Sequence, residues 1–312
     1  MTGSFSREDV LALMPEWADQ VLDIQPLTGG ITNTLYRVRT GRGDDVVVRL
    51  HGARTEIFID RDLEVENLRR LENTGVTPRL VRYLPAQRAT LVAFIPGRVL
   101  KNPDFLDEKL WPVLVEPIHR VHRSGVVLPR VFEPLVEVRR LARVFGDLNV
   151  DYPEFDIPGT LDRLERLAAA AAAPVDDYVA CHNDLLAENF VLAGEGEAAR
   201  MHLIDWEYAG QSTPHYDLAD MFQEIAVPRA IERELLRLYW QDQDLDTAIR
   251  LCDLHKPFPD IYWFLWSLIQ RAVSTINFDY YSYGATKYRN AWANIKAART
   301  LHGVRSDGAR SG

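Results

Sequence analysis

A polar stretch in the second half of the chain, HNDLLAEN at residues 182–189, combines residue types that could handle a phosphate group. Asp184 would accept or orient the proton of a substrate hydroxyl, and Asn189 offers a hard oxygen ligand to Mg²⁺. A second aspartate, Asp205 in MHLIDWE, would be the other metal ligand. His182 is expected to brace the loop through hydrogen bonds rather than to touch substrate. The pattern predicts phosphoryl transfer, and its alternative is a polar loop in which an aspartate caps a helix.

The stretch LTGGITNTLYRV fits a phosphate-binding turn. Gly29 and Gly30 lie between two β-like runs, where backbone amides could approach phosphate oxygens. Thr32 and Asn33 would add donors. A plain hairpin turn is the alternative for the glycine pair.

Two charged residues and a connector fit the rest of a nucleotide site. Arg49 ends the apolar run VVVRL and needs an anionic partner there, either a triphosphate oxygen or a helix carboxylate. Glu64 is the candidate carboxylate, and its alternative is a solvated charge on a helix face. Phe94 and Ile95, in AFIPG, would offer backbone groups to an adenine ring.

The elements that position these residues change character along the chain. From Ile24 to about Phe94, β-like runs alternate with turns and predict an antiparallel sheet, interrupted by one helix within residues 59–75 that stops at Gly75. Helical patterns dominate afterwards, and the short runs FVLA and MHLIDWE predict a β-hairpin. We expect helices within the segments 107–125, 133–145, 160–173, 229–240 and 259–276.

The fold class expected is α+β with two lobes. Residues 1–96 would form a nucleotide-binding lobe of sheet plus helix, with a hinge at about 94–98. Residues 97–302 would form a mainly helical lobe that carries catalysis and acceptor binding. The polar tail 303–312 is expected to be disordered.

Composition excludes several function classes. The chain has 312 residues and a formal net charge of −9, and it shows no basic cluster, which disfavours a nucleic-acid partner. The longest apolar run, IYWFLWSLI, is about half of the roughly 20 residues that a membrane span needs, so no membrane insertion is expected. Cys181 and Cys252 are expected to be buried thiols in a reducing, cytoplasmic setting.

Taken together and in order, these motifs resemble the choline/ethanolamine kinase family, which is protein-kinase-like and related to the aminoglycoside phosphotransferases. The resemblance runs from Leu27 to about Tyr288 and includes HNDLLAENFVL, LIDWEYAG, YDLADMFQE and YWFLWSLIQRAVSTINFDYYSYG. It implies a bilobal kinase-like fold, ATP and Mg²⁺ as cofactors, and an amino alcohol as acceptor. Leu186 departs from the family, which often carries glutamine there, and Thr32 replaces a common serine.

The resemblance also implies an aromatic site for the acceptor cation. A quaternary ammonium has no N–H to donate, so aromatic faces hold it best, at about 0.5–2 kcal/mol per ring. Trp263 and Trp266 lie three apart on one helix face, with Phe278 and Tyr283 expected in the next turns. Core packing of these rings is the alternative.

Several further residues near these motifs have two interpretations. Tyr208 would face the acceptor. Glu224 would place a negative charge near the acceptor cation or be a surface carboxylate. Glu207 would also place a negative charge there or would instead anchor its loop. Asp217 in YDLAD is expected to cap a helix and brace the catalytic loop. The histidines at 119, 122, 202, 215 and 255 have no metal-ligand spacing and are expected to be surface or hydrogen-bonded core groups.

The function that these patterns favour is transfer of the ATP γ-phosphoryl group to choline or a related amino alcohol such as ethanolamine. A kinase for another acceptor, an aminoglycoside or thiamine, is the alternative; its pocket would need many carboxylates, whereas this C-terminal region is rich in rings. A silent nucleotide-binding scaffold is a third possibility. Such a scaffold is expected to lose Asp184, Asn189 or Asp205, and all three are present.

Overall fold

The computed structural model describes residues 7–17, 19–27, 33–52, 55–150, 152–241, 244–274 and 276–303. The chain forms two compact units, which are described separately. Unit 1 comprises Met1–Leu100 and Glu188–Tyr208, and unit 2 comprises Lys101–Ala187 and Ala209–Gly312. The expected division near residue 96 stays a prediction, and the hairpin after Asn189 belongs with the N-terminal part of the chain. The tail 304–312 lies outside the described residues.

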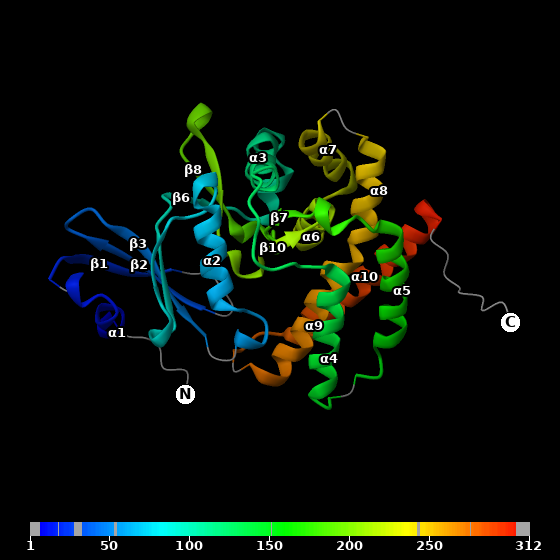
Figure 1. Ribbon diagram of the computed structural model, residues 1–312, viewed down its shortest axis with the longest axis horizontal. Coiled ribbons are helices and arrows are strands. Elements are labelled where there is room, and N and C mark those ends of the chain that lie inside the picture. The colour runs from blue at the N-terminus through cyan, green and yellow to red at the C-terminus, as the bar shows by residue number, and fades with distance from the viewer. Residues whose placement is uncertain are drawn as a thin grey trace. The chain divides into compact units, whose positions relative to one another are not determined.

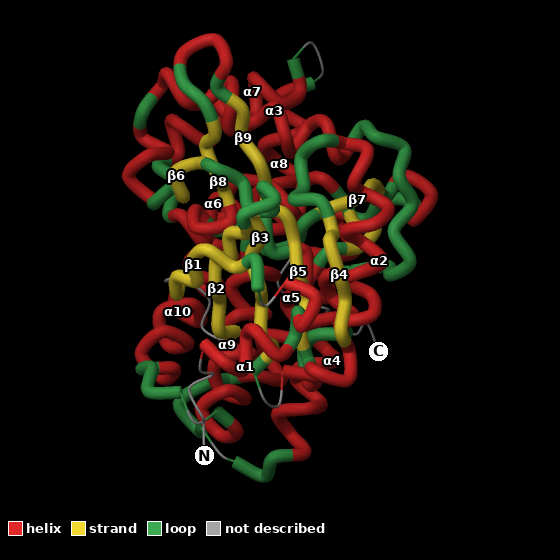
Figure 2. The backbone as a smooth tube through the Cα atoms, turned by 90° about the vertical axis from the view of Figure 1, so that its left-hand side faces the viewer, coloured by secondary structure: helices red, strands yellow, loops and turns green. Residues whose placement is uncertain are grey.

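Unit 1 is built on a five-stranded antiparallel sheet, as the alternating pattern predicted. Figure 2 shows its strands side by side in the order β1-β2-β3-β5-β4. Apolar side chains of alternate residues, among them Val46, Val48 and Leu50, form the core on one face. The strand β4 had not been predicted. The strands are β1 Val21–Leu27, β2 Asn33–Thr40, β3 Asp45–His51, β4 Leu80–Leu84 and β5 Ala89–Ala93.

The predicted helix of unit 1 is α2, Arg61–Leu71. The side chain of Asp60 caps its start by accepting from the amides of Asp62 and Leu63, at 3.0 and 3.2 Å. The chain leaves the helical region at Gly75, where φ is 68° and glycine carries no steric penalty. A short helix before the sheet, α1 (Arg7–Ala12), had not been predicted.

The predicted β-hairpin is confirmed as β8 (Phe190–Ala193) and β9 (Arg200–Leu203), and β6 (Gly97–Val99) pairs with β8 on its other side. The second strand was expected to cover MHLIDWE, residues 201–207, but β9 ends at Leu203. Asp205 has φ of 69°, which takes the chain out of the extended conformation, and Trp206–Tyr208 form a 3₁₀ turn. Asp205 is therefore displayed on a bend after the strand.

Unit 2 is mainly helical, as expected, with one small antiparallel sheet of β7 (Val179–Cys181) and β10 (Gly210–Ser212) (Figure 1). All five predicted helical segments contain a helix, and α6, α8 and α10 are additional. The helices are α3 Trp111–His122, α4 Pro134–Asp147, α5 Ile157–Ala171, α6 Pro214–Ile225, α7 Arg229–Trp240, α8 Leu245–His255, α9 Pro257–Val273 and α10 Tyr280–His302. None of the helices in the described ranges combines the length and apolarity that a bilayer crossing requires.

The most extensive contact between two helices of unit 2 joins α9 and α10, which lie side by side (Figure 1). Every residue of α9 from Pro257 to Gln270 is buried, so this helix is the centre of the unit. A Cβ on Gly284 of α10 would lie 2.1 Å from Ser267 Oγ. The glycine thus permits the close approach of the two helices.

Candidate active site

In unit 1, the guanidinium of Arg49 on β3 forms ion pairs with Glu64 of α2 and with Asp205 after β9. The predicted pairing of Arg49 with a helix carboxylate is confirmed. Glu64 has a side chain only 2% exposed, so its alternative as a solvated helix charge is wrong. The role of this pair toward a nucleotide stays a prediction.

A second arginine, Arg61, completes the cluster and was missed from the sequence. It lies at the start of α2 and donates to Glu64 Oε2 and Glu207 Oε2, each at 2.7 Å, and to Asn33 Oδ1 at 3.1 Å. Glu207 is thereby held inside unit 1, which supports its interpretation as a loop anchor. Arg61 is one charge in a run of charges, so its spacing gave no signal.

The five charged side chains of this cluster perturb one another. Burial and the charge of Asp205 raise the pKa of Glu207 to about 8, against the opposing effect of Arg49 and Arg61. Burial opposes the charge of Arg49, but Asp205 and Glu64 outweigh it and raise its pKa. Arg49 therefore keeps its positive charge beside the carboxylates.

The donor set of this cluster fits a magnesium ion. Carboxylate oxygens of Glu64, Asp205 and Glu207 lie within 4.8 Å of one another, and Mg²⁺ prefers hard oxygen ligands. Asn189 immediately precedes β8, and its carbonyl accepts from the amide of Ile204 at 3.0 Å. The two predicted metal ligands, Asn189 and Asp205, thus flank the base of one hairpin.

Only some of the remaining candidates for nucleotide binding lie within the described residues. Gly29, Gly30 and Thr32 lie outside the described residues. Phe94 follows β5, its amide donates to the carbonyl of Asp45 at 2.9 Å, and the guanidinium of Arg37 lies 3.6 Å from its ring centre. Ile95 is half-buried beside it, and Tyr208, the last residue of unit 1, is buried. Their contacts with a ligand stay predictions.

In unit 2, helix α6 holds the backbone of the predicted catalytic loop through two aspartates. Asp217 accepts from the amides of His182 and Asn183 at 2.9 and 2.7 Å, and Asp220 accepts from the amide of Leu185 at 2.7 Å. The prediction that Asp217 braces this loop is confirmed, although Thr213 caps α6 instead.

These bonds hold the backbone around Asp184, the predicted catalytic aspartate. Asn183 has φ of 64°, in the left-handed region, which asparagine adopts more readily than most residues. Asp184, the next residue, is 5% exposed. His182 is buried as well, in agreement with a bracing role. The loop therefore presents Asp184 from a backbone that is held on both sides.

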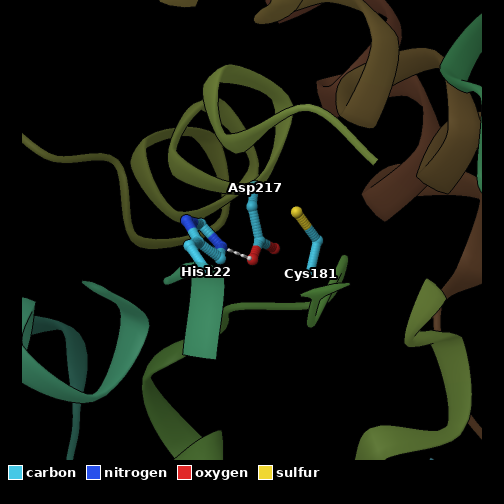
Figure 3. A group of neighbouring side chains, drawn as sticks. All are labelled: His122, Cys181 and Asp217. Carbon is cyan, nitrogen blue, oxygen red and sulfur yellow. Dashed lines mark hydrogen bonds and ion pairs between the residues drawn. The ribbon is translucent and has the colours of Figure 1, made fainter. Parts of the chain in front are cut away.

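His122 extends this support to α3 (Figure 3). Its Nε2 lies 2.8 Å from Asp217 Oδ2, and its Nδ1 lies 2.6 Å from the hydroxyl of Tyr239. Although burial disfavours the charged form, the bond from His122 and the loop amides lower the pKa of Asp217. Cys181 lies beside them as a buried thiol, as expected. Because hydrogen bonds occupy both nitrogens of His122 and the carboxylate of Asp217, this group is a structural brace.

Three of the aromatic residues predicted for the acceptor, Trp263, Trp266 and Tyr283, lie on α9 and α10, and Phe278 lies between the two helices. The ring centres of Trp263 and Trp266 are 5.8 Å apart, and that of Tyr283 is 6.4 Å from Trp266. The expectation that Phe278 and Tyr283 continue the turns of α9 is wrong, because α9 ends at Val273 and α10 begins at Tyr280. Both tryptophans are buried, and Phe278 is 40% exposed.

Carboxylates and one lysine border these rings. Glu224 of α6 accepts from Lys287 Nζ at 2.6 Å, and its Oε2 lies 3.5 Å from the hydroxyl of Tyr283. Its alternative as a surface carboxylate is wrong, since its side chain is 9% exposed. Asp260, on α9, lies 3.8 Å from the same Nζ. The sequence did not reveal Lys287, because nothing in NFDYYSYGATKY marked a helix.

The charge of Asp184, the predicted catalytic carboxylate, reaches one of the predicted acceptor rings. Burial raises the pKa of Tyr283, and the nearby charges of Glu224 and Asp184 raise it further. Burial and Glu224 likewise raise the pKa of Asp220. Asp184 therefore lies close enough to Tyr283 to affect its charge within unit 2.

Comparison with known proteins supports the resemblance to the choline/ethanolamine kinase family. A sequence model described as choline/ethanolamine kinase matches residues 24–235. Mouse ethanolamine kinase 2 is 27% identical over 91% of this chain and 79% of its own length. Probable choline kinase 2 of Arabidopsis thaliana is 26% identical over 92% of this chain and 90% of its own length.

Solved structures are similar along most of the chain. A choline/ethanolamine kinase family protein from Mesorhizobium loti is 27% identical, covers 93% of this chain and 97% of its own, and has a TM-score of 0.75. Plasmodium vivax ethanolamine kinase, at 19% identity and a TM-score of 0.79, shares the fold over 94% of this chain and 89% of its own. The chain belongs to the choline/ethanolamine kinase family and is an ATP-dependent small-molecule kinase.

Proposed function

We propose that the chain transfers the γ-phosphoryl group of ATP to the hydroxyl of choline, or of the closely related ethanolamine, giving the phosphomonoester and ADP. The observation that carries this proposal is that Asp220 bonds both to the amide of Leu185, next to Asp184, and to the indole of Trp263, which places the loop beside the rings within unit 2. A small amino alcohol needs both within its own length, a carboxylate for its hydroxyl and rings for its cation.

In the proposed reaction, Asp184 accepts the proton of the acceptor hydroxyl. The freed oxygen forms a bond to the γ-phosphorus while the bond from that phosphorus to the β,γ-bridging oxygen breaks, and ADP leaves with the electron pair. The loop amides held by Asp217 and Asp220 keep Asp184 oriented for this step. Burial of Asp184 limits its contact with competing water.

Unit 1 would serve the nucleotide. Asn189 and Asp205 would hold Mg²⁺, which neutralises charge on the β- and γ-phosphates when bound. Arg49 would contact phosphate, and Glu64 would orient Arg49. The proposed contacts of Gly29, Gly30, Thr32 and Asn33 with phosphate, and of Phe94 and Ile95 with adenine, belong to the same assignment.

The rings favour choline over acceptors with several amino groups. An aminoglycoside needs available carboxylates, yet the carboxylates that border the rings already have partners: Glu224 with Lys287, Asp220 with Trp263, and Asp260 with Asn294. Aromatic rings suit a cation that donates no hydrogen bond. Phe278 and Tyr208 would add further rings.

Coupled ADP release across choline, dimethylethanolamine, ethanolamine, thiamine and kanamycin tests the proposal. We expect kcat/KM to fall stepwise as methyl groups are removed from choline, and no turnover of kanamycin. A higher kcat/KM for ethanolamine would reassign the acceptor within the family. Turnover of kanamycin alone would refute the amino alcohol assignment.

A further inference from the structure

Asp220 joins two parts of unit 2 that the proposed reaction needs at a fixed separation. It lies in the middle of α6 and its side chain is completely buried. Its Oδ2 accepts from the amide of Leu185 at 2.7 Å, next to Asp184. Its Oδ1 accepts from the indole N–H of Trp263 on α9 at 3.2 Å. One carboxylate thus connects the catalytic loop to the predicted acceptor wall.

The neighbouring aspartate on the same helix face makes a different set of contacts. Asp217 accepts from His182, Asn183 and His122, which belong to the loop and to α3. Asp220 lies one turn later and reaches α9 as well. Asp217 therefore shapes the loop, whereas Asp220 sets where the loop lies relative to Trp263.

The size of the acceptor makes this separation important. In choline, two carbon atoms separate the hydroxyl oxygen from the nitrogen, so the ring that holds the cation and the carboxylate that takes the proton must keep a narrow range of distances. A misplacement of about 1 Å between reacting groups can cost roughly 100-fold in rate. A rigid link between Trp263 and the loop would prevent such a shift.

We propose that Asp220 is a positioning residue that holds the cation-binding ring of Trp263 in register with the loop that carries Asp184. This proposal rests on the proposed function. It assigns to Asp220 an effect on acceptor use that neither a loop brace nor a packing residue would have.

The variants that test the link are Asp220→Asn and Trp263→Phe. The two donors bond to different oxygens of Asp220, and asparagine has an oxygen at only one of these two positions. Phenylalanine keeps a ring without the N–H donor. Asp253→Asn is the matched control, since Asp253 is a buried aspartate whose partners, Arg229, Lys256 and His302, lie outside the loop and the acceptor wall. Urea unfolding confirms that each variant folds.

Steady-state kinetics with choline and MgATP give the first readout. We expect Asp220→Asn to raise the KM for choline roughly 10-fold and to lower kcat several-fold, with the KM for ATP within about two-fold of wild type. Trp263→Phe should raise the choline KM less in the Asp220→Asn background than in wild type, because the link is already weakened. Equal changes in the KM for choline and the KM for ATP would overturn the proposal. So would an effect of Trp263→Phe on the choline KM that is the same in the Asp220→Asn background as in wild type.

Hydrogen exchange of the amides of residues 182–187 gives a readout that does not depend on turnover. Asp220→Asn should speed their exchange about 10-fold or more, whereas Asp253→Asn should leave it at the wild-type rate. Unchanged exchange in Asp220→Asn would refute the link even if the enzyme is active. Absence of wild-type turnover with every amino alcohol would instead refute the proposed function, and the exchange result would still decide whether Asp220 holds the loop.

Discussion

The two units hold their functional charges in opposite ways. In unit 1, Arg49 and Arg61 pair with the side chains of Glu64, Asp205 and Glu207. In unit 2, Asp217 and Asp220 are bound mainly by backbone amides and by ring N–H groups. A side-chain ion pair can exchange its partner for a phosphate or a cation, but a backbone amide keeps its place.

Under the proposed function, this difference would divide the tasks between the units. The cluster of unit 1 suits ligands that arrive and leave with their own charges, as MgATP does. The bonds of unit 2 suit a geometry that must stay constant while the chemistry proceeds. The following predictions test this contrast, beginning with the largest expected effect.

Removal of the proposed catalytic carboxylate, Asp184, should have the greatest consequence. Asp184→Asn keeps the size of the side chain but removes the proton acceptor, so kcat should fall by roughly 10²–10⁴-fold. Asp205→Ala should be similarly inactive through loss of the metal ligand. The measurement is ADP release with MgATP and choline, together with a circular dichroism spectrum that remains native.

Asp162→Asn provides the control for these two variants, because Asp162 is an exposed aspartate on α5. Its kcat should match wild type. Substantial turnover by Asp184→Asn or Asp205→Ala would contradict the roles assigned to those residues.

Breaking the ion-pair cluster of unit 1 should destabilise the fold. Arg49→Ala leaves Glu64 and Asp205 with fewer countercharges in a nearly buried site, and we expect a loss of about 2–4 kcal/mol in the free energy of unfolding. Arg39→Ala, which breaks the exposed pair with Asp23, should cost less than about 1 kcal/mol. Urea denaturation measures the free energy of unfolding of both variants. Similar losses would mean that burial does not strengthen the cluster.

Removing one ring of the predicted acceptor wall should affect one substrate selectively. Trp266→Ala should raise the KM for choline by about 2- to 30-fold, in line with one cation–π contact, and should change the KM for ATP less. Steady-state kinetics with each substrate varied in turn provide the measurement. Equal shifts in the two KM values would favour core packing as the only role of Trp266.

The smallest effect concerns pH. Burial raises the pKa of Asp260 to about 8, against the opposing charge of Lys287 and with support from Glu224. An unfolded aspartate has a pKa near 3.9, so between about pH 4 and pH 8 the folded state retains a proton that the unfolded state releases, and stability falls as pH rises.

Asparagine at position 260 cannot titrate. The stability of Asp260→Asn relative to wild type should therefore increase between pH 5 and pH 8.5, because only the wild type loses stability as the pH rises through this range. Thermal unfolding at the two pH values measures the difference. A constant difference would show that Asp260 does not bind a proton in this range.

Much of the fold could be predicted because the pattern is local. Alternating strands, the cap and stop of α2, and five helical segments follow from periodicity, turns and caps. The helix α10 could not be predicted, because its first turns are rich in tyrosine and contain Gly284, and glycine usually interrupts a helix. In the structure, that glycine allows contact with Ser267, a relation that only the packed helices reveal.

The candidate site was predictable in its residue types but not in its partners. The order of HNDLLAEN and IDWE predicts which residues carry the chemistry, and the structure adds the partners that hold them. The bond from Arg49 to Asp205 joins residues 156 positions apart, and no spacing rule predicts such a pair. Arg61, Asp220 and Lys287 had ordinary helix surroundings in sequence. The spacing of Asp217 and Asp220, three apart in YDLAD, was the one signal that could have placed both on the loop.

Helix α10 links two distant parts of unit 2. Its first turns carry Tyr283 and Lys287, and its last residue, His302, bonds to Asp253 at 3.0 Å. A helix rises about 1.5 Å per residue, so roughly 22 Å of helix separate Lys287 from His302. Substitutions in its final turn should therefore change how the end of the chain is anchored and leave the surroundings of Tyr283 as they are.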